Sequence, residues 1–175
     1  MADEVNLLVN GELTHGGPGY TPGWNFSQWQ LKDGTPEAAA AKSGIVKEPG
    51  NDANQCLWIG LTAPVKAYIW FQQEVKCDPA ETYTLTFRVK GAAGSDHTGP
   101  ASGSGIYLLG PEGQWLTFQA INEVTFSAEW KNYTASITTS DDTAKLGVRL
   151  GCSKPGAFDL YFDDIKLHRG KPDRK

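Results

Sequence analysis

The residues best suited to chemistry lie in the stretch 67–75, where aromatic and polar side chains alternate with aliphatic ones. Because successive side chains of a strand point to opposite faces, a strand here turns one row inward and the other outward. The outward row is Tyr68, Trp70, Gln72 and Glu74. Aromatic rings pack on the apolar face of a sugar ring, and planar polar groups bind its hydroxyls. This row therefore predicts a surface suited to a neutral, hydroxyl-rich ligand.

Five further side chains are candidates for the same surface. They are Trp58, Tyr107, Trp115, Phe118 and Arg149. Trp58 is outward in the alternating stretch 55–61, and Arg149 lies between two glycines, which leaves room for a ligand to approach the sheet. Alternatively, the Gly- and Ser-rich loop 91–105 covers Trp58 or Trp70, which then form a small satellite core. The sequence leaves both interpretations open.

An acidic pair, Asp163 and Asp164, interrupts the last alternating stretch, 158–167. Strict alternation places Asp163 on the same side as Ile165 and Leu167, where an unpaired carboxylate costs several kcal/mol or stays protonated. We expect either a cation as its partner or a strand twist that carries the acidic pair to a solvated edge.

The elements that position these residues are predicted to be strands. The chain has 175 residues, with 20 Gly, 10 Pro and 11% aromatic residues, which favours many turns over long helices. About ten short alternating stretches, the first at 5–9, are separated by turns and show no βαβ pattern. The expected fold is all-β, a two-sheet antiparallel β-sandwich, with residues 1–169 as a single module and 170–175 as a flexible tail.

Two local features of this fold remain to be placed. Residues 35–42 (TPEAAAAK) are the only plausible helix, or else an extended lead-in to the following strand. Trp24 follows a Gly- and Pro-rich loop and is expected to close one end of the core rather than to contact a ligand.

Composition argues against several classes of protein. A net charge of −4 without a basic run disfavours nucleic acid and anionic membranes as partners. None of the three histidines is predicted beside a nucleophile, and although Glu74 and Asp159 could form a carboxylate pair for glycoside cleavage, no local pattern singles them out. We therefore expect no enzymatic activity of its own. Three cysteines, Cys56, Cys77 and Cys152, allow at most one internal disulfide and do not settle the redox compartment.

Several motifs in order resemble one family. They are NLLVNGEL near the start, Gly23-Trp24, TYTLTF in the middle, EWKNYT later and LYFDDIKL at the end. This order is similar to that of the jelly-roll carbohydrate-binding modules of families four, sixteen and twenty-two. The resemblance implies a jelly roll with a concave binding face, on which a polysaccharide chain lies in an aromatic-lined cleft. It also implies a monomeric, non-catalytic appendage of a secreted glycan-degrading enzyme.

The same resemblance implies a structural calcium ion. Asp163 matches the metal carboxylate of the family, and Asp52 matches a second acid in the middle loop. Glu12 and Gln55 match positions that supply backbone carbonyls, while Thr14 replaces the usual glutamate and offers only a neutral oxygen. Calcium accepts mixed oxygen ligands in flexible geometry, so we expect Ca²⁺ in a structural role.

Two functions of different classes follow. The first is binding of a polysaccharide. The net negative charge disfavours polyuronates and sulfated glycans, and a cleft with two Trp and one Tyr favours internal segments of soluble, neutral β-linked glucans, xylans or mannans. The alternative is a protein-interaction or cell-surface adhesion sandwich, because exposed Trp and Tyr serve protein interfaces as well.

Overall fold

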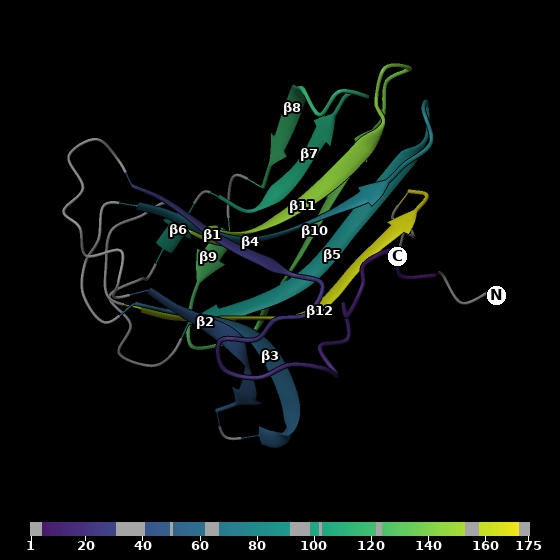
Figure 1. The fold of residues 1–175 in the computed structure, drawn as a ribbon. Coiled ribbons are helices and arrows are strands. Elements are labelled where there is room, and N and C mark those ends of the chain that lie inside the picture. Colours follow the sequence, from purple (N-terminus) through teal and green to yellow (C-terminus); the bar gives the residue numbers. More distant parts are fainter. Residues whose placement is uncertain are drawn as a thin grey trace.

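The structure is a computed structural model that describes residues 5–30, 41–49, 51–61, 67–91, 99–101, 103–121, 124–152 and 158–171. Two five-stranded antiparallel sheets form its body (Figure 1). The first sheet contains, in spatial order, β1 (Asn25–Gln30), β4 (Ala67–Lys76), β11 (Lys145–Cys152), β7 (Gly105–Leu109) and β8 (Trp115–Ala120). The second contains β10 (Lys131–Thr138), β5 (Thr82–Gly91), β12 (Phe158–Arg169), β3 (Asn51–Leu61) and β2 (Ala41–Glu48). A short pair, β6 (Gly99–Ala101) and β9 (Val124–Phe126), forms a third, two-stranded sheet.

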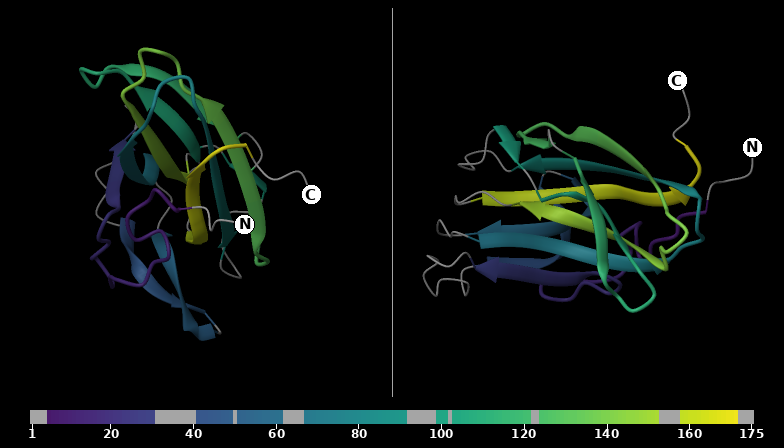
Figure 2. Two further views of the ribbon diagram at one scale, coloured as in Figure 1. Left: turned by 90° about the vertical axis from the view of Figure 1, so that its right-hand side faces the viewer. Right: turned by 90° about the horizontal axis from the view of Figure 1, so that it is seen from above.

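The two sheets pack face to face around one apolar core, which confirms the predicted all-β sandwich (Figure 2). In regular strands alternate residues face inward, as in β11, where Leu146, Val148 and Leu150 are fully buried. Phe87 of β5 contacts Phe162 of β12 within this core, with ring centroids 6.2 Å apart. The period-two pattern therefore separates the core face from the outer face in both sheets.

The described ends of the chain lie side by side. The Leu7 N–H donates to the Leu167 carbonyl oxygen at 2.8 Å, and the Asn6 side chain bonds the backbone of both Ile165 and Leu167. β3 pairs only with the first half of β12, so the N-terminal segment covers the edge that β3 leaves open. The strand predicted at 5–9 is wrong, because this segment bonds largely through the side chains of Asn6 and Gln73 and turns away at Asn10, where φ is 52°.

β12 contains a bulge that changes the placement of the acidic pair. The register with β5 shifts between Asp163 and Lys166, and Asp164 has a φ of 48°. One extra residue reverses the alternation, so Phe162 before the bulge and Ile165 after it both face the core. Asp163 consequently lies on the outer face of the second sheet, and its predicted place beside Ile165 is wrong.

The remaining expectations concern the predicted helix, Trp24 and the cysteines. Residues 31–40, which hold most of the predicted helix, lie outside the described residues, and β2 begins at Ala41. Trp24 is only 3% exposed and belongs to the core, as predicted. No disulfide joins the three cysteines, all of which are described, and burial raises the pKa of Cys56 to about 12. The described residues include no helix that could cross a membrane.

Candidate functional site

The outer face of the first sheet collects most of the predicted binding residues. Ile69, Phe71 and Gln73 of β4 are buried toward the core, so the alternate residues of this strand face outward. These outward residues are Tyr68, Trp70, Gln72 and Glu74, in agreement with the sequence pattern. On β11 the outward positions include Gly147, Arg149 and Gly151. The predicted row and Arg149 therefore lie on adjacent strands of one face.

An aromatic stack lies beside Arg149. The Tyr107 ring of β7 lies over Gly147, and any side chain at position 147 would collide with that ring. The Trp115 ring of β8 stacks on Tyr107 with centroids 4.8 Å apart and an interplanar angle of 11°. Tyr107 is thereby only 2% exposed, whereas Trp115 is 51% exposed. The indole of Trp115 is therefore a platform backed by a second ring and open on its outer side.

The glycines beside Arg149 have a different role from the one predicted. Rather than leaving room for an external ligand, Gly147 accommodates the Tyr107 ring, whereas a side chain at Gly151 would meet the Ile69 carbonyl oxygen and the Cα and Cβ atoms of Trp70. The chain itself therefore fills both spaces, with a ring at Gly147 and with strand β4 at Gly151. Because a ring can lie flat on a sheet only where no Cβ intervenes, glycine at position 147 sets the height of the Tyr107 ring above the sheet.

Arg149 projects into the middle of this aromatic layer. Its guanidinium carbon is 4.4 Å from the ring centroid of Trp70, and it lies 5.5 to 5.8 Å from the centroids of three further rings. The three are Tyr107, Trp115 and Phe118. The Nε atom is buried and has no hydrogen-bond partner among the described residues. Burial lowers the pKa of Arg149, and the nearby Tyr107 opposes this effect.

Polar groups border the aromatic layer on β4. The Trp70 Nε1–H donates to Gln72 Oε1 at 2.8 Å, and Glu74 accepts from the Tyr107 hydroxyl at 3.3 Å and from Lys145 at 3.4 Å. Burial and the Glu74 charge raise the pKa of Tyr107, so its hydroxyl stays a donor. A hollow of about 350 Å³ adjoins this border. Its lining consists of Val9, Gly23, Asn25, Gln72, Gln73 and Glu74.

β1 adds residues that sequence reasoning missed. Asn25 pairs with Gln72 and Ser27 with Trp70, so both side chains share the outward face of β4. The available signal was the alternation of Asn25 and Ser27 with Phe26, whose ring lies 5.3 Å from Phe71. The stretch lies directly after a Gly- and Pro-rich loop, and its polar residues concealed this alternation.

Trp58 does not join the site. It lies on β3 of the second sheet, between the core residues Leu57 and Ile59, and therefore points to the outer face of that sheet. Its Nε1–H donates to Asp159 Oδ1 at 2.8 Å. Trp58 and Trp70 thus lie on opposite sides of the sandwich. The same geometry separates Glu74 from Asp159, so the structure does not assemble this carboxylate pair for glycoside cleavage.

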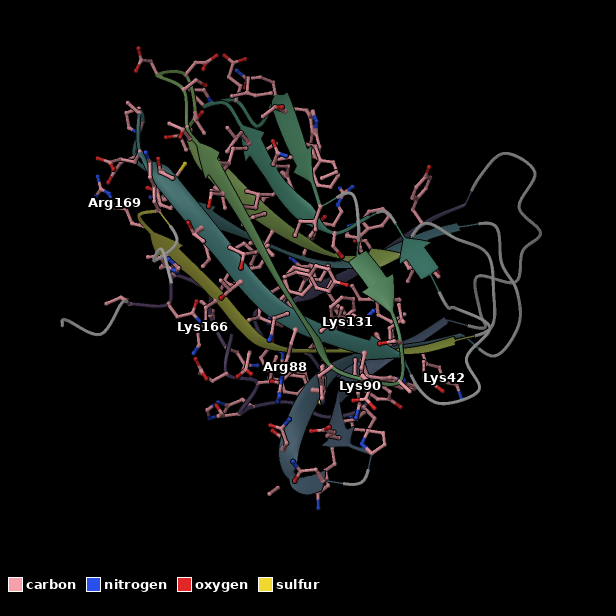
Figure 3. All side chains as sticks on the ribbon, turned by 180° about the vertical axis from the view of Figure 1, so that it is seen from behind. Lys42, Arg88, Lys90, Lys131, Lys166 and Arg169 are labelled. Atoms are coloured by element: carbon pink, nitrogen blue, oxygen red, sulfur yellow. The ribbon has the colours of Figure 1, made fainter. Side chains whose placement is uncertain are left out.

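A charged network occupies the outer face of the second sheet (Figure 3). Asp163, 6% exposed, accepts from the Arg88 guanidinium and from the Asn54 amide, the latter at 2.8 Å. Glu48 accepts from Lys90 at 2.8 Å and from the Trp130 indole N–H at 2.7 Å. These contacts lower the pKa of Glu48 from 4.5 to about 2, against the opposing effect of burial. Asp163 therefore has its expected cation partner, which is Arg88.

The described residues do not fit a calcium site built on Asp163. Its Oδ2 atom already accepts from Arg88 and Asn54, and a guanidinium at this position repels a metal cation. Glu12 and Thr14 are exposed, and Thr14 contacts His15. No group of three metal-binding side chains occurs among the described residues. The Asp52 side chain lies outside them, and Gln55 was expected to contribute only its carbonyl, so calcium at this loop stays a prediction.

Comparisons with known proteins concern the fold. No family model matches the sequence, and no curated protein matches it. Solved structures that match nearly the whole chain include the following three. A CBM4 module is 19% identical, with a TM-score of 0.63 and coverage of 93% of this chain and 99% of its own. TmCBM61 in complex with β-1,4-galactotriose is 20% identical, with a TM-score of 0.62 and coverage of 95% and 99%.

The third structure is the enzymatically active domain of tailspike protein 4 from bacteriophage CBA120. It is 14% identical, with a TM-score of 0.66, and the match covers 95% of this chain. The chain spans only 22% of that tailspike domain. Modules of families 16 and 22 also match, over 93% and 95% of this chain. The resemblance in fold to families 4, 16 and 22 is therefore confirmed.

Proposed function

We propose that this chain is a non-catalytic carbohydrate-binding module that holds a polysaccharide on the outer face of the sheet β1-β4-β11-β7-β8. The observation that carries the proposal is the half-exposed Trp115 indole, braced from beneath by the Tyr107 ring. The similarity in fold to modules with a sugar-binding role supports it.

A sugar chain finds complementary groups along this face. An apolar pyranose face stacks on Trp115, while Gln72, Glu74 and Asn25 offer donors and acceptors to equatorial hydroxyls at the far side. Trp115 on β8 and the polar border on β4 are three strand spacings apart, or ~14 Å at ~4.8 Å per strand. A ligand that uses both must be longer than one sugar ring. The proposed ligand is therefore a segment of a polysaccharide chain rather than a single sugar.

The wider role that we propose is targeting. A module of this kind, comprising residues 1–169 and acting as a monomer in a secreted parent protein, holds an attached glycan-degrading domain near its substrate. Tethering raises the effective concentration of the catalytic domain at the polymer without any contribution to bond cleavage. The tail at 170–175 is then the start of a linker.

A protein-interaction module is the second candidate. The exposed rings of Trp115 and Tyr68, 51% and 37% exposed, are also the residue types that anchor protein interfaces. A protein-binding face of this kind promotes self-association at high concentration, which sedimentation measures directly.

Affinity electrophoresis tests the proposal. The chain is run through gels that contain soluble β-glucan, xylan, glucomannan, pectin or alginate. We expect retardation in at least one gel and about fivefold lower affinity for Trp115→Ala, because an aromatic contact contributes about 1 kcal/mol. Trp58→Phe, on the opposite face, is the control and should behave as the wild type. Absence of wild-type retardation in every gel would favour the protein partner.

A further inference from the structure

Arg149 occupies the centre of the proposed binding face. β11 is the middle strand of its sheet, and the Arg149 side chain is surrounded by aromatic rings from β4, β7 and β8. Contacts at 4.4 to 5.8 Å from four ring centroids restrict the movement of the guanidinium. A ligand that stacks on Trp115 would therefore meet a positive charge in a fixed position, 5.5 Å from that ring's centroid.

Arg149 differs from the other described arginines in its partners. Arg88 pairs with Asp163 and Asp164, and Arg169 pairs with two further carboxylates, Asp78 and Glu81. Within the described part of the chain, no carboxylate forms an ion pair with Arg149. The nearby Glu74 is paired with Lys145 instead. The aromatic rings offset part of the cost of desolvating the charge, but they supply no oxygen acceptor.

Among the described residues of this face the net charge is therefore positive, although the chain as a whole carries −4. Lys145 and Glu74 cancel each other, which leaves the charge of Arg149 uncompensated. A carboxylate binds a guanidinium through two parallel hydrogen bonds, a geometry that a neutral hydroxyl cannot reproduce. Because Nε is buried, the two terminal nitrogens are the ones available for an approach from the ligand side.

We propose, on the basis of the proposed function, that this face selects acidic polysaccharides, whose uronic acid carboxylates bind Arg149 while a neighbouring ring stacks on Trp115. The net negative charge of the chain opposes long-range attraction of such a polymer. Selectivity then comes from the short-range contact at Arg149. This replaces the expectation from overall charge that the ligand is neutral.

The experiment compares an acidic polymer with its own neutral derivative. Alginate and carboxyl-reduced alginate, and pectin with its carboxyl-reduced form, keep the same linkages and differ only in charge. We expect the wild-type chain to bind one acidic polymer at least tenfold more tightly than its reduced form. Arg149→Gln should bring this ratio to about one, whatever its effect on the affinity for the reduced polymer. Lys166→Gln, which removes one exposed charge from the second sheet, should preserve the ratio (Figure 3).

The outcomes separate this inference from the proposed function. Equal affinity of the wild-type chain for acidic and reduced polymers, or a ratio that survives Arg149→Gln, would overturn the inference and leave the binding module intact. No binding to any acidic or neutral polymer would overturn both. Salt gives a second measurement without a variant: 0.5 M NaCl should reduce the ratio, because it screens the partly exposed ion pair. A ratio that is insensitive to salt would also refute the contact with Arg149.

Discussion

The Glu48→Gln variant tests how much the charged network on the outer face of the second sheet contributes to the stability of the fold. Glu48 is 9% exposed and accepts hydrogen bonds from Lys90, Trp130 and Asn54. A lowering of its pKa from 4.5 to about 2 corresponds to about 3 kcal/mol of folding free energy, at about 1.4 kcal/mol per pKa unit. Gln keeps an oxygen acceptor for Trp130 and Asn54 but leaves the Lys90 charge without its counterion. We therefore expect the variant to lose up to about 3 kcal/mol at neutral pH.

The direction of the Glu48 pKa shift determines how the free energy of unfolding depends on pH. Because the pKa of Glu48 is lower in the folded state, its contribution is fully present above pH 4.5 and is lost as the pH falls toward 2. The wild-type free energy of unfolding should fall across this window more steeply than that of Glu48→Gln. The two proteins should converge near pH 2. Urea unfolding followed by tryptophan fluorescence at pH 7, 4.5, 3 and 2 measures both curves.

An exposed carboxylate serves as the control. Glu81 pairs with Arg169 at the surface, where solvent and salt screen the interaction. Glu81→Gln should therefore keep most of the wild-type slope between pH 4.5 and 2. Parallel wild-type and Glu48→Gln curves over that range would refute the reasoning, because they would show that Glu48 titrates alike in the folded and unfolded states.

Three further predictions follow from single contacts. Arg88→Gln should destabilise the fold by about 3 kcal/mol, measured by urea unfolding, because it leaves the buried Asp163 carboxylate without a cation; an unchanged midpoint would contradict this pairing. If Arg88 balances Asp163, a calcium chelator should leave the thermal midpoint of the wild-type chain unchanged, whereas a drop of several degrees would indicate calcium at the loop that contains Asp52. Gly147→Ala should cost about 1 to 3 kcal/mol and weaken polysaccharide binding, because the added methyl displaces the Tyr107 ring beneath Trp115; wild-type retardation in gels would rule this out.

The alternation of inward-facing and outward-facing residues along the strands accounts for most of the fold prediction. The pattern of 67–75 separated the row that contains Trp70 from the core row, and the pattern of 144–151 did the same for Arg149. Both succeeded because each strand is regular and buries one face. The same rule failed in β12, where a bulge at Asp164 reverses the faces within one strand. A bulge depends on pairing with neighbouring strands, which a single stretch of sequence does not reveal.

The candidate site was predicted only in part, for a related reason. Alternation says that Trp58 faces outward, but it does not say from which sheet, and Trp58 belongs to the second sheet. The stacking of Trp115 on Tyr107 could not be predicted either, since it depends on strand register between β7 and β8. The cation beside Asp163 was expected, yet its identity as Arg88 required the register of β5 with β12.

The adjacent position of the two chain ends has a consequence for protein engineering. The backbone bond from Leu7 to Leu167 holds the first and last described segments together at one end of the sandwich. A short linker between these ends would close the chain without distorting either sheet, so new termini can be opened at a turn elsewhere. The turn at Gly110–Gly113 between β7 and β8 is a suitable place, because residues 111–113 are exposed and the Gly113 N–H bonds only locally, to the Gly110 carbonyl oxygen at 2.9 Å. Such a circular permutant would carry its attachment point beside Trp115 and thus place any fused domain directly at the binding face.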